Sequence, residues 1–253
     1  MNKVSAKDVS EYFAKSSVLE HYQEATSKVG LWNSEKIIFS QTFADKNCNL
    51  LELGCGIGRI SFGLWQLGYR NLLASDFSKP MVKRAKRLNN SLNTGIIFQV
   101  KDATSTSLPN ESFDGIIFGF NGLMQIPLRE NRKKVMSEVN RLLKPDRYFV
   151  FTTHDRTMPK WKKFWTLERK KWNRGDQNPE LLEFGDRFEE TPRGKLYIHV
   201  PEVQDIRRDL IEAGFSVESD FLRSKISQET PLVNKYSDEC RFWIAKKKSD
   251  LIL

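Results

Sequence analysis

A short segment of the chain combines an acidic residue with three closely spaced glycines. Glu52, Gly54, Gly56 and Gly58 lie in LLELGCGIGRI, between an apolar run typical of a strand and a pattern typical of a helix. A turn at such a junction directs backbone amides and the helix N-terminus towards a ligand, and glycine lets the backbone approach it closely. The segment therefore predicts a cofactor-binding loop.

Two common nucleotide-binding motifs do not match this loop. A dinucleotide motif GxGxxG that starts at Gly54 or at Gly56 would need glycine where the chain has Arg59 or Ser61. An ATP-binding phosphate loop needs a lysine directly after its last glycine, and no glycine of this segment precedes a lysine. The pattern that remains is acid-x-Gly-x-Gly-x-Gly.

This pattern, with the acidic residues that follow it, resembles the class I S-adenosylmethionine-dependent methyltransferases over roughly residues 30–245. The resemblance implies that Asp76, at the end of the second expected strand, binds the ribose, since a carboxylate can accept both ribose hydroxyls. It implies in the same way that Asp102 and Ala103 contact the adenine. The residues alone also allow Asp76 to cap the next helix and Asp102 to begin a turn.

The same resemblance implies further contacts to S-adenosylmethionine from the glycine loop, the fourth expected strand and an aromatic N-terminal segment. The implied residues are Tyr22, Trp32, Glu52, Gly54, Cys55, Gly56, Gly58, Arg59, Phe77, Met81, Phe118, Gly119, Phe120 and Met124. Other roles remain open from the residues alone: the aromatic residues could pack in a core, the glycines could only form a tight turn, and Glu52 could only anchor the loop.

Methyl transfer from a sulfonium has a neutral leaving group, so much of the catalysis can come from orientation and desolvation. No fixed catalytic triad is expected. An acceptor that must lose a proton would need a base, and the candidates are His154 and Asp155, just after the fifth expected strand, and His199 in an expected hairpin. His154 could also be an ordinary polar residue at a strand end.

Metal chemistry and disulfide bonds are not expected. The three cysteines form no CxxC pair and cannot all pair with one another, and the three histidines form no HExxH motif. These residues are Cys48, Cys55, Cys240, His21, His154 and His199. The pattern indicates reduced thiols and a site without metal.

Alternation of strands and helices from Asn49 onward predicts βαβ units, hence an α/β, Rossmann-like, open and mostly parallel sheet with a reversed last strand. Helical spacing before this point predicts an N-terminal helical cap over residues 1–44. The core is expected over 45–156 and 196–248, with an inserted lid and hairpin over 157–195.

The inserted segment is basic and rich in tryptophan. The chain has 253 residues and a net charge of +9, and much of the excess lies between Lys160 and Arg174. Helical spacing places one group of residues on one face, which predicts a lid that packs over the acceptor pocket: Trp161, Phe164, Trp165, Glu168 and Trp172. The competing interpretation is that aromatic and basic residues together grip RNA.

The expected function is methyl transfer from S-adenosylmethionine to a nitrogen or oxygen of a small-molecule acceptor. The alternatives are an RNA or protein methyltransferase, which the positive charge suggests, and a non-catalytic regulatory protein that binds the cofactor. No apolar run is long enough to span a membrane, and Asp8 and Glu11 interrupt any export signal, so a cytoplasmic location is expected.

Overall fold

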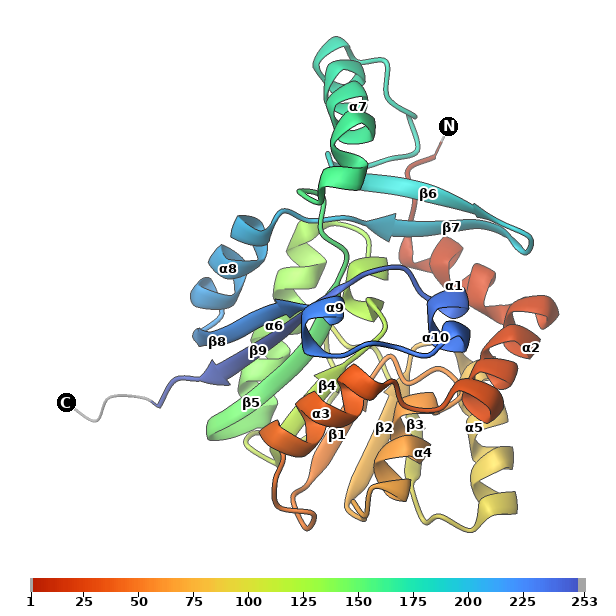
Figure 1. Cartoon of the computed structure of the whole chain (residues 1–253), viewed down its shortest axis with the longest axis vertical. Helices are drawn as coiled ribbons and strands as arrows, with labels where there is room; N and C mark the ends of the chain where they lie inside the picture. Colours follow the sequence, from red (N-terminus) through yellow and green to blue (C-terminus); the bar gives the residue numbers. More distant parts are fainter. Residues whose placement is uncertain (1, 250–253) are drawn as a thin grey trace.

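A seven-stranded sheet forms the centre of the protein in the computed structural model, which describes residues 2–249 (Figure 1). The strand order is β3-β2-β1-β4-β5-β9-β8. Neighbouring strands from β3 to β5 are parallel, and β9 is antiparallel to both β5 and β8. The α/β fold with a mostly parallel sheet and a reversed last strand is thereby confirmed. The strands are β1 (Leu50–Leu53), β2 (Leu72–Asp76), β3 (Ile97–Val100), β4 (Phe113–Phe118), β5 (Leu143–Thr153), β8 (Phe215–Leu222) and β9 (Arg241–Lys247).

The central strands separate two hydrophobic cores, because successive side chains of a strand point to opposite faces. Leu50 and Ile117 belong to the core under α3, α4 and α5, whereas Leu51 and Ile116 belong to the core under α6 and α8. Both faces are covered, which explains why these strands read as almost continuous apolar runs. The helices are α3 (Asn33–Thr42), α4 (Arg59–Gln66), α5 (Lys79–Leu92), α6 (Arg129–Leu142) and α8 (Val203–Glu212).

Helices from both ends of the chain meet beside the sheet (Figure 1). The expected N-terminal helices are present as α1 (Ala6–Ala14), α2 (Ser16–Glu24) and the π-helical turn η1 (Ala25–Val29), which contacts α10 (Pro231–Tyr236). Neither α10 nor α9 (Arg223–Ile226) was expected. The start of α10 does carry a sequence signal, since Thr230 caps it and proline follows at its first position.

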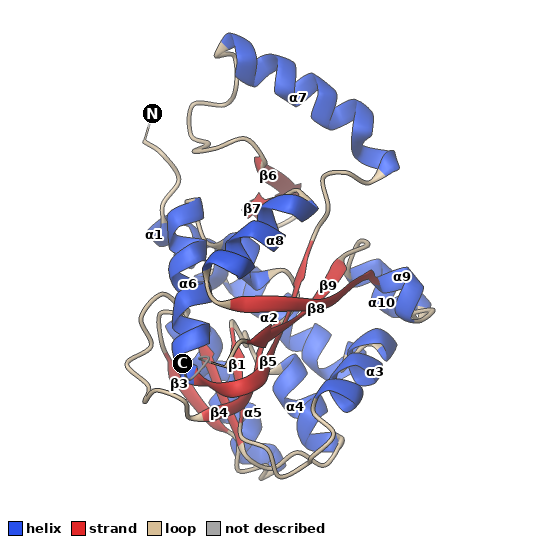
Figure 2. Ribbon diagram, turned by 90° about the vertical axis from the view of Figure 1, so that its left-hand side faces the viewer, coloured by secondary structure: helices blue, strands red, loops and turns tan. Residues whose placement is uncertain are grey.

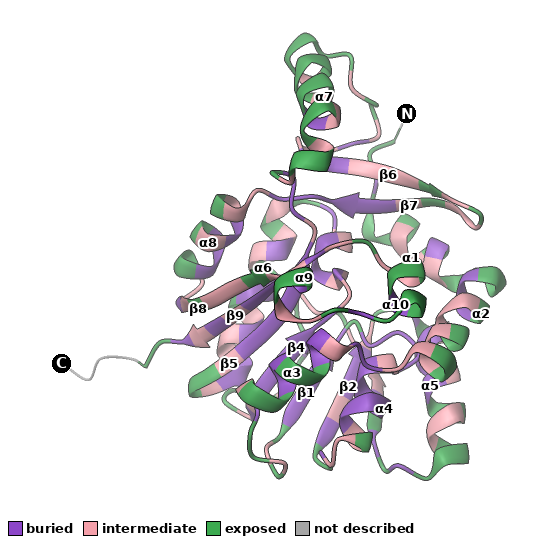
Figure 3. Cartoon of the chain, viewed as in Figure 1, coloured by how far each residue is buried: buried purple, intermediate pink, exposed green. Residues whose placement is uncertain are grey.

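The segment between β5 and α8 leaves the main sheet. It contains the 3-10 turn η3 (Pro159–Trp161), α7 (Lys162–Arg174) and the hairpin of β6 (Asp186–Thr191) and β7 (Gly194–His199). The short 3-10 helix η2 (Gly122–Gln125) lies outside this segment, between β4 and α6. Helix α7 projects from the body, and most of its surface is exposed (Figures 2 and 3). Because β7 continues to His199, the expected boundary at residue 195 lies inside this strand. Within residues 2–249, every helix is too short or too polar to cross a membrane.

Candidate functional site

A cavity of about 330 Å³ lies at the carboxyl edge of the parallel strands, where open α/β sheets usually bind ligands. The loop between β1 and α4 forms its floor, and the ends of β2, β3 and β4 add polar and aromatic side chains. Helices α1, α2 and α10 and the turn η1 close the opposite side. The cavity is therefore built from both ends of the chain and the middle of the sheet.

The glycine loop takes a backbone path that side chains would obstruct. Gly54 has φ +63°, and a Cβ atom there would lie 2.4 Å from the Phe118 ring. Gly56 has φ +54°, a conformation that favours glycine, and its amide donates to Oδ2 of Asp76 over 2.8 Å. The loop thus exposes backbone to the cavity and is tied directly to the end of β2.

Asp76 holds two backbone amides and still has capacity for a ligand. Its Oδ2 accepts from Gly56, and its Oδ1 accepts from the Ser78 amide over 2.7 Å. Burial raises the pKa of Asp76, and these two hydrogen bonds offset only part of the rise. Each carboxylate oxygen has a second lone pair, so both ribose hydroxyls could be accepted there. Ser78 begins α5, but its hydroxyl has no hydrogen-bond partner among the described residues.

Glu52 is buried at the end of β1 and also lines the cavity. Burial raises the pKa of Glu52 to about 8, although the Ser61 hydroxyl donates a hydrogen bond to it and lowers the pKa in part. At neutral pH this carboxyl therefore holds a proton for much of the time. Its contact with Ser61 joins the strand to the helix that follows the glycine loop.

A buried ion pair supports the other end of the loop. Arg59 donates to both carboxylate oxygens of Glu35, over 2.6 and 2.7 Å, and also to the Gly30 carbonyl oxygen. The guanidinium lies 4.8 Å from the Trp32 ring and 5.5 Å from the Phe120 ring. Sequence reasoning included Arg59, Trp32 and Phe120 but missed Glu35, which no local motif marks.

The structure brings most of the implied cofactor residues together. All except Gly58 and Met124 line the cavity, namely Tyr22, Trp32, Glu52, Gly54, Cys55, Gly56, Arg59, Asp76, Phe77, Met81, Asp102, Ala103, Phe118, Gly119 and Phe120. A Cβ atom on Gly58 would lie 2.9 Å from Phe62 and 3.0 Å from Phe98, so this glycine serves packing. Met124 is fully buried in the core under α6 and α8.

The opposite side of the cavity was not expected in this form. It is lined by α1, α2, η1, the end of η2 and the residues after it, the start of α6, and α10. The lining residues are Ala6, Val9, Ser10, Phe13, His21, Ala25, Thr26, Val29, Gln125, Ile126, Pro127, Asn131 and Tyr236. Helical spacing at the N-terminus predicted a helical cap, but it did not show what these helices cover.

The three residues expected to act as a base lie outside this cavity, and this expectation is corrected. The ring of His154 is held between two protein groups: its Nδ1 lies 3.0 Å from the Glu239 carbonyl oxygen and its Nε2 lies 3.2 Å from the Asn121 amide nitrogen. A ring that donates to a carbonyl and accepts from an amide has neither nitrogen left for an acceptor.

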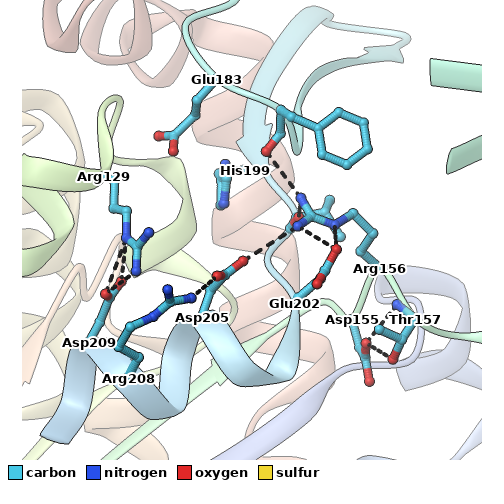
Figure 4. Close-up of polar contacts among 12 residues, drawn as sticks. Arg129, Asp155, Arg156, Thr157, Glu183, His199, Glu202, Asp205, Arg208 and Asp209 are labelled. Carbon is cyan, nitrogen blue, oxygen red and sulfur yellow. Dashed lines mark hydrogen bonds and ion pairs between the residues drawn. The ribbon is translucent and has the colours of Figure 1, made fainter. Parts of the chain in front are cut away.

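Asp155 has a structural role (Figure 4). Its Oδ1 accepts from the Thr157 amide over 2.8 Å and from the Thr157 hydroxyl over 2.5 Å, and Arg241 pairs with its Oδ2 over 3.0 Å. The carboxylate is 4% exposed and does not reach the cofactor cavity. It fixes the chain where β5 leads into the inserted segment.

His199 lines a separate polar cavity of about 300 Å³ (Figure 4). Its Nδ1 lies 2.8 Å from Oδ1 of Asp186, and burial lowers the pKa of His199. Asp186 also accepts from the Tyr197 hydroxyl and from two backbone amides, so all its lone pairs have protein partners. Glu183 lies close enough to form a metal-binding group with these two residues, but it is paired with Arg132 over 2.6 Å.

Charged residues that line the same polar cavity hold the inserted segment against the core. Arg156 donates to the carbonyl oxygens of Phe184 and Val200 (Figure 4). It also pairs with Glu202, directly before α8, and with Asp205 in the first turn of α8. The Arg156 side chain is 7% exposed, so these contacts are largely shielded from water. His199 therefore lies among the ion pairs that connect the inserted segment to the core.

The expected lid over the acceptor pocket is also corrected. Helix α7 forms, and its aromatic face packs on the segment before β6, with Trp165 and Trp172 against Phe184 at centroid distances of 5.8 and 6.3 Å. Glu168 pairs with Lys171 over 2.6 Å. No residue from 157 to 195 lines the cofactor cavity. The tryptophans find their apolar partners within the insertion, so α1, α2 and α10 enclose the site instead.

Comparisons with known proteins agree with this geometry. Residues 50–146 match the family model described as a methyltransferase domain. The eEF1A lysine and N-terminal methyltransferase of Homo sapiens is 28% identical over 94 residues, which cover 37% of this chain and 13% of that protein. The chain thus matches only a small part of the length of this curated relative.

Solved structures share the fold. A Methanosarcina mazei S-adenosylmethionine-dependent methyltransferase superposes with a TM-score of 0.68 at 19% identity, covering 87% of this chain and all of that one. The magnesium protoporphyrin IX methyltransferase of Synechocystis PCC 6803, crystallised with S-adenosylhomocysteine, gives 0.56 at 18% identity, with 90% and 84% covered. Residues 50–146 thus match a methyltransferase domain, and the solved structures show that the chain shares its fold with S-adenosylmethionine-dependent methyltransferases.

Proposed function

We propose that the chain transfers the methyl group of S-adenosylmethionine to a nitrogen or oxygen atom of a small-molecule acceptor. The observation that carries this proposal is one continuous cavity, which runs from the glycine loop and Asp76 to α1 and α2. In such a cavity the cofactor and the acceptor would bind next to each other. Holding two reactants in one geometry lowers the barrier to their reaction.

The residues of the loop and strand ends would bind and orient the cofactor. When bound, S-adenosylmethionine supplies a methyl group on a positively charged sulfur, whose departure leaves a neutral thioether. Asp76 would accept from the ribose, while Asp102, Ala103 and Phe77 would contact the adenine. Phe77 supports this role because it is 49% exposed at the end of β2 although it is apolar.

The aromatic side chains over the loop would exclude water from the methionine end. Tyr22 lies beside Gly56, with a ring carbon 3.5 Å from where a Cβ atom would be, and its ring contacts Phe120 edge-on. Trp32 is 1% exposed and its ring also contacts Phe120 edge-on. A dry site strengthens the electrostatic contacts made inside it and prevents hydrolysis.

A protein acceptor is the second candidate, because the similar human protein is an eEF1A lysine and N-terminal methyltransferase. That similarity covers 37% of this chain, so it bears little on the elements that enclose the acceptor side. An RNA acceptor has less support, since the basic helix α7 contributes no residue to the cavity.

Cofactor binding can be tested by calorimetric titration of S-adenosylmethionine into the wild-type chain and Asp76→Ala. Loss of two hydrogen bonds to a carboxylate, each worth about 1.5 kcal/mol, should lower the affinity by a factor of ten or more. Asp176→Ala is the matched control, because Asp176 is an exposed carboxylate that pairs with Arg174 outside the cavity. Equal affinity for a folded Asp76→Ala protein and the wild type would contradict the assignment.

The acceptor class can be tested by incubating the protein and cofactor with separate fractions of a cell extract. We expect S-adenosylhomocysteine to form with the fraction of small molecules, and to form more slowly with Asp76→Ala when the cofactor concentration is limiting. Product formed only with the protein fraction, or only with the RNA fraction, would refute a small-molecule acceptor.

A further inference from the structure

The part of the cavity that faces the glycine loop from the other side has a distinct chemistry. We call it the acceptor chamber, and it is lined by Ala6, Val9, Ser10, Phe13, His21, Ala25, Thr26, Val29, Gln125, Ile126, Pro127, Asn131 and Tyr236. We infer that this chamber binds an uncharged, largely apolar acceptor and rejects carboxylates, phosphates and ammonium groups. This inference rests on the proposed function and names its substrate class.

The charged residues of the cavity come from the strand ends and the start of α4, namely Glu52, Arg59, Asp76, Lys101 and Asp102. Arg59 is paired with Glu35, and Lys101 donates to the Thr106 carbonyl oxygen over 2.8 Å. Asp102 accepts from the Thr104 amide over 2.8 Å. Among the described residues that line the acceptor chamber there is no Asp, Glu, Lys or Arg. An acceptor with a full charge would therefore find no counter-ion in the chamber.

His21 is the one histidine in the chamber, and its surroundings keep it neutral. A guanidinium nitrogen of Arg193, from the tip of the β6–β7 hairpin, donates to its Nδ1 over 2.9 Å. Arginine can only donate, so the ring carries its proton on Nε2. Burial and the positive charge of Arg193 lower the pKa of His21, against a smaller opposing effect of Glu24. The ring also stacks on Tyr236 at 5.0 Å, which leaves it as a flat, uncharged wall.

The free energy needed to remove water from a charged group then determines which acceptors can bind in the chamber. Moving an ion from water into an apolar site is unfavourable unless a counter-charge and hydrogen bonds replace its hydration. The chamber offers apolar and aromatic surface and a few neutral polar groups, such as Ser10, Gln125 and Asn131. These groups can orient a hydroxyl, carbonyl or neutral amine without charge compensation. A lysine ammonium of a protein and the phosphates of RNA do not meet this condition.

The test uses pairs of small aromatic compounds of similar size that differ in charge, such as methyl 4-hydroxybenzoate and 4-hydroxybenzoate. Their binding to the chain of residues 1–253, saturated with S-adenosylhomocysteine, is measured by saturation-transfer NMR titration. We expect the dissociation constant of the ester to be lower than that of the carboxylate by a factor of about ten or more, because nothing in the chamber compensates the desolvation of the charge. A second pair, benzamide and benzylamine, tests the ammonium in the same way.

A charge placed in the chamber should reverse this preference. Val9→Lys puts an ammonium on the face of α1 that lines the chamber, and the carboxylate should then bind more tightly than the ester. Glu11→Lys is the matched control, since Glu11 lies on the outer face of α1 with a side chain 65% exposed. It should leave the preference of the wild type unchanged.

Several results would overturn the inference: equal or tighter binding of either charged compound to the wild type, failure of both neutral compounds to bind, or the same preference in Val9→Lys and Glu11→Lys. Calorimetry of the cofactor separates this failure from failure of the proposed function. If S-adenosylmethionine does not bind, the proposed function fails. If it binds and the charge preference is absent, only the substrate class fails.

Discussion

The ion pair of Glu35 and Arg59 should contribute strongly to stability, because it is buried and joins two distant elements. The side chains are 1% and 11% exposed, and the pair links the start of α3 to the first turn of α4. The Glu35 carboxylate also accepts from the Trp32 amide over 2.9 Å. Replacing Glu35 alone by leucine leaves the guanidinium of Arg59 buried without its counter-ion.

The expected loss from Glu35→Leu is about 3–5 kcal/mol, the usual cost of removing one partner of a buried pair. This is a large share of a total stability of about 5–15 kcal/mol, and it corresponds to a fall in Tm of about 10 °C for a chain of this length. Arg59→Met should cost a similar amount, since it leaves the carboxylate buried.

The assay is urea unfolding of both single variants and of the double variant Glu35→Leu, Arg59→Met. The double variant contains neither charge, so its loss should be smaller than the sum of the single losses by about 2–3 kcal/mol. Glu11→Ala is the control, because its pair with Lys7 is 3.8 Å long and exposed, and we expect no measurable loss. Additive losses, or single losses no larger than that of the control, would refute the reasoning.

Two further predictions concern the cofactor loop. Because burial raises the pKa of Glu52 from 4.5 to about 8, the folded chain binds this proton more tightly than the unfolded chain, so the free energy of unfolding should fall as the pH rises from about 5 to about 8. In Glu52→Gln this component of the pH dependence should disappear in urea unfolding at pH 5, 6.5 and 8; a wild-type chain that gains stability relative to Glu52→Gln over this range would contradict the argument. Gly54→Ala should abolish binding of S-adenosylmethionine in calorimetry, because the added Cβ atom would lie 2.4 Å from Phe118. Gly95→Ala, also at positive φ but in open space, should keep full affinity, and equal affinity of the two variants would show that the loop tolerates a side chain.

Local patterns were enough to predict the sheet and the glycine loop between β1 and α4. Apolar runs that alternate with helical spacing determine which segments become strands and helices, and Glu52 with its three glycines marks the first turn between them. The order of strand ends then places Asp76 and Asp102 at one edge of a parallel sheet. These inferences succeed because each depends on residues close together in the chain or on a fold rule for consecutive elements.

The sequence indicated the face of α7 that carries Trp165 and Trp172 but not its partner. Periodicity shows that a helix has an apolar face, and many surfaces of a molecule can cover such a face. In the folded chain, Phe184 packs against both tryptophans, so α7 has no role in closing the cavity. Likewise, His199 carried no sign of its hydrogen bond to Asp186, which removes it from the cofactor site.

The acceptor side of the cavity was decided by tertiary structure alone. It forms where α1 and α2 meet α10, and Arg193 from the hairpin sets the proton position of His21 across 172 residues of sequence. Contacts between residues so far apart in the sequence depend on the direction in which each segment leaves the core. The sequence by itself determined the sheet and the glycine loop at its edge, whereas only the packing of distant helices determined the shape and charge of the cavity wall that faces this loop.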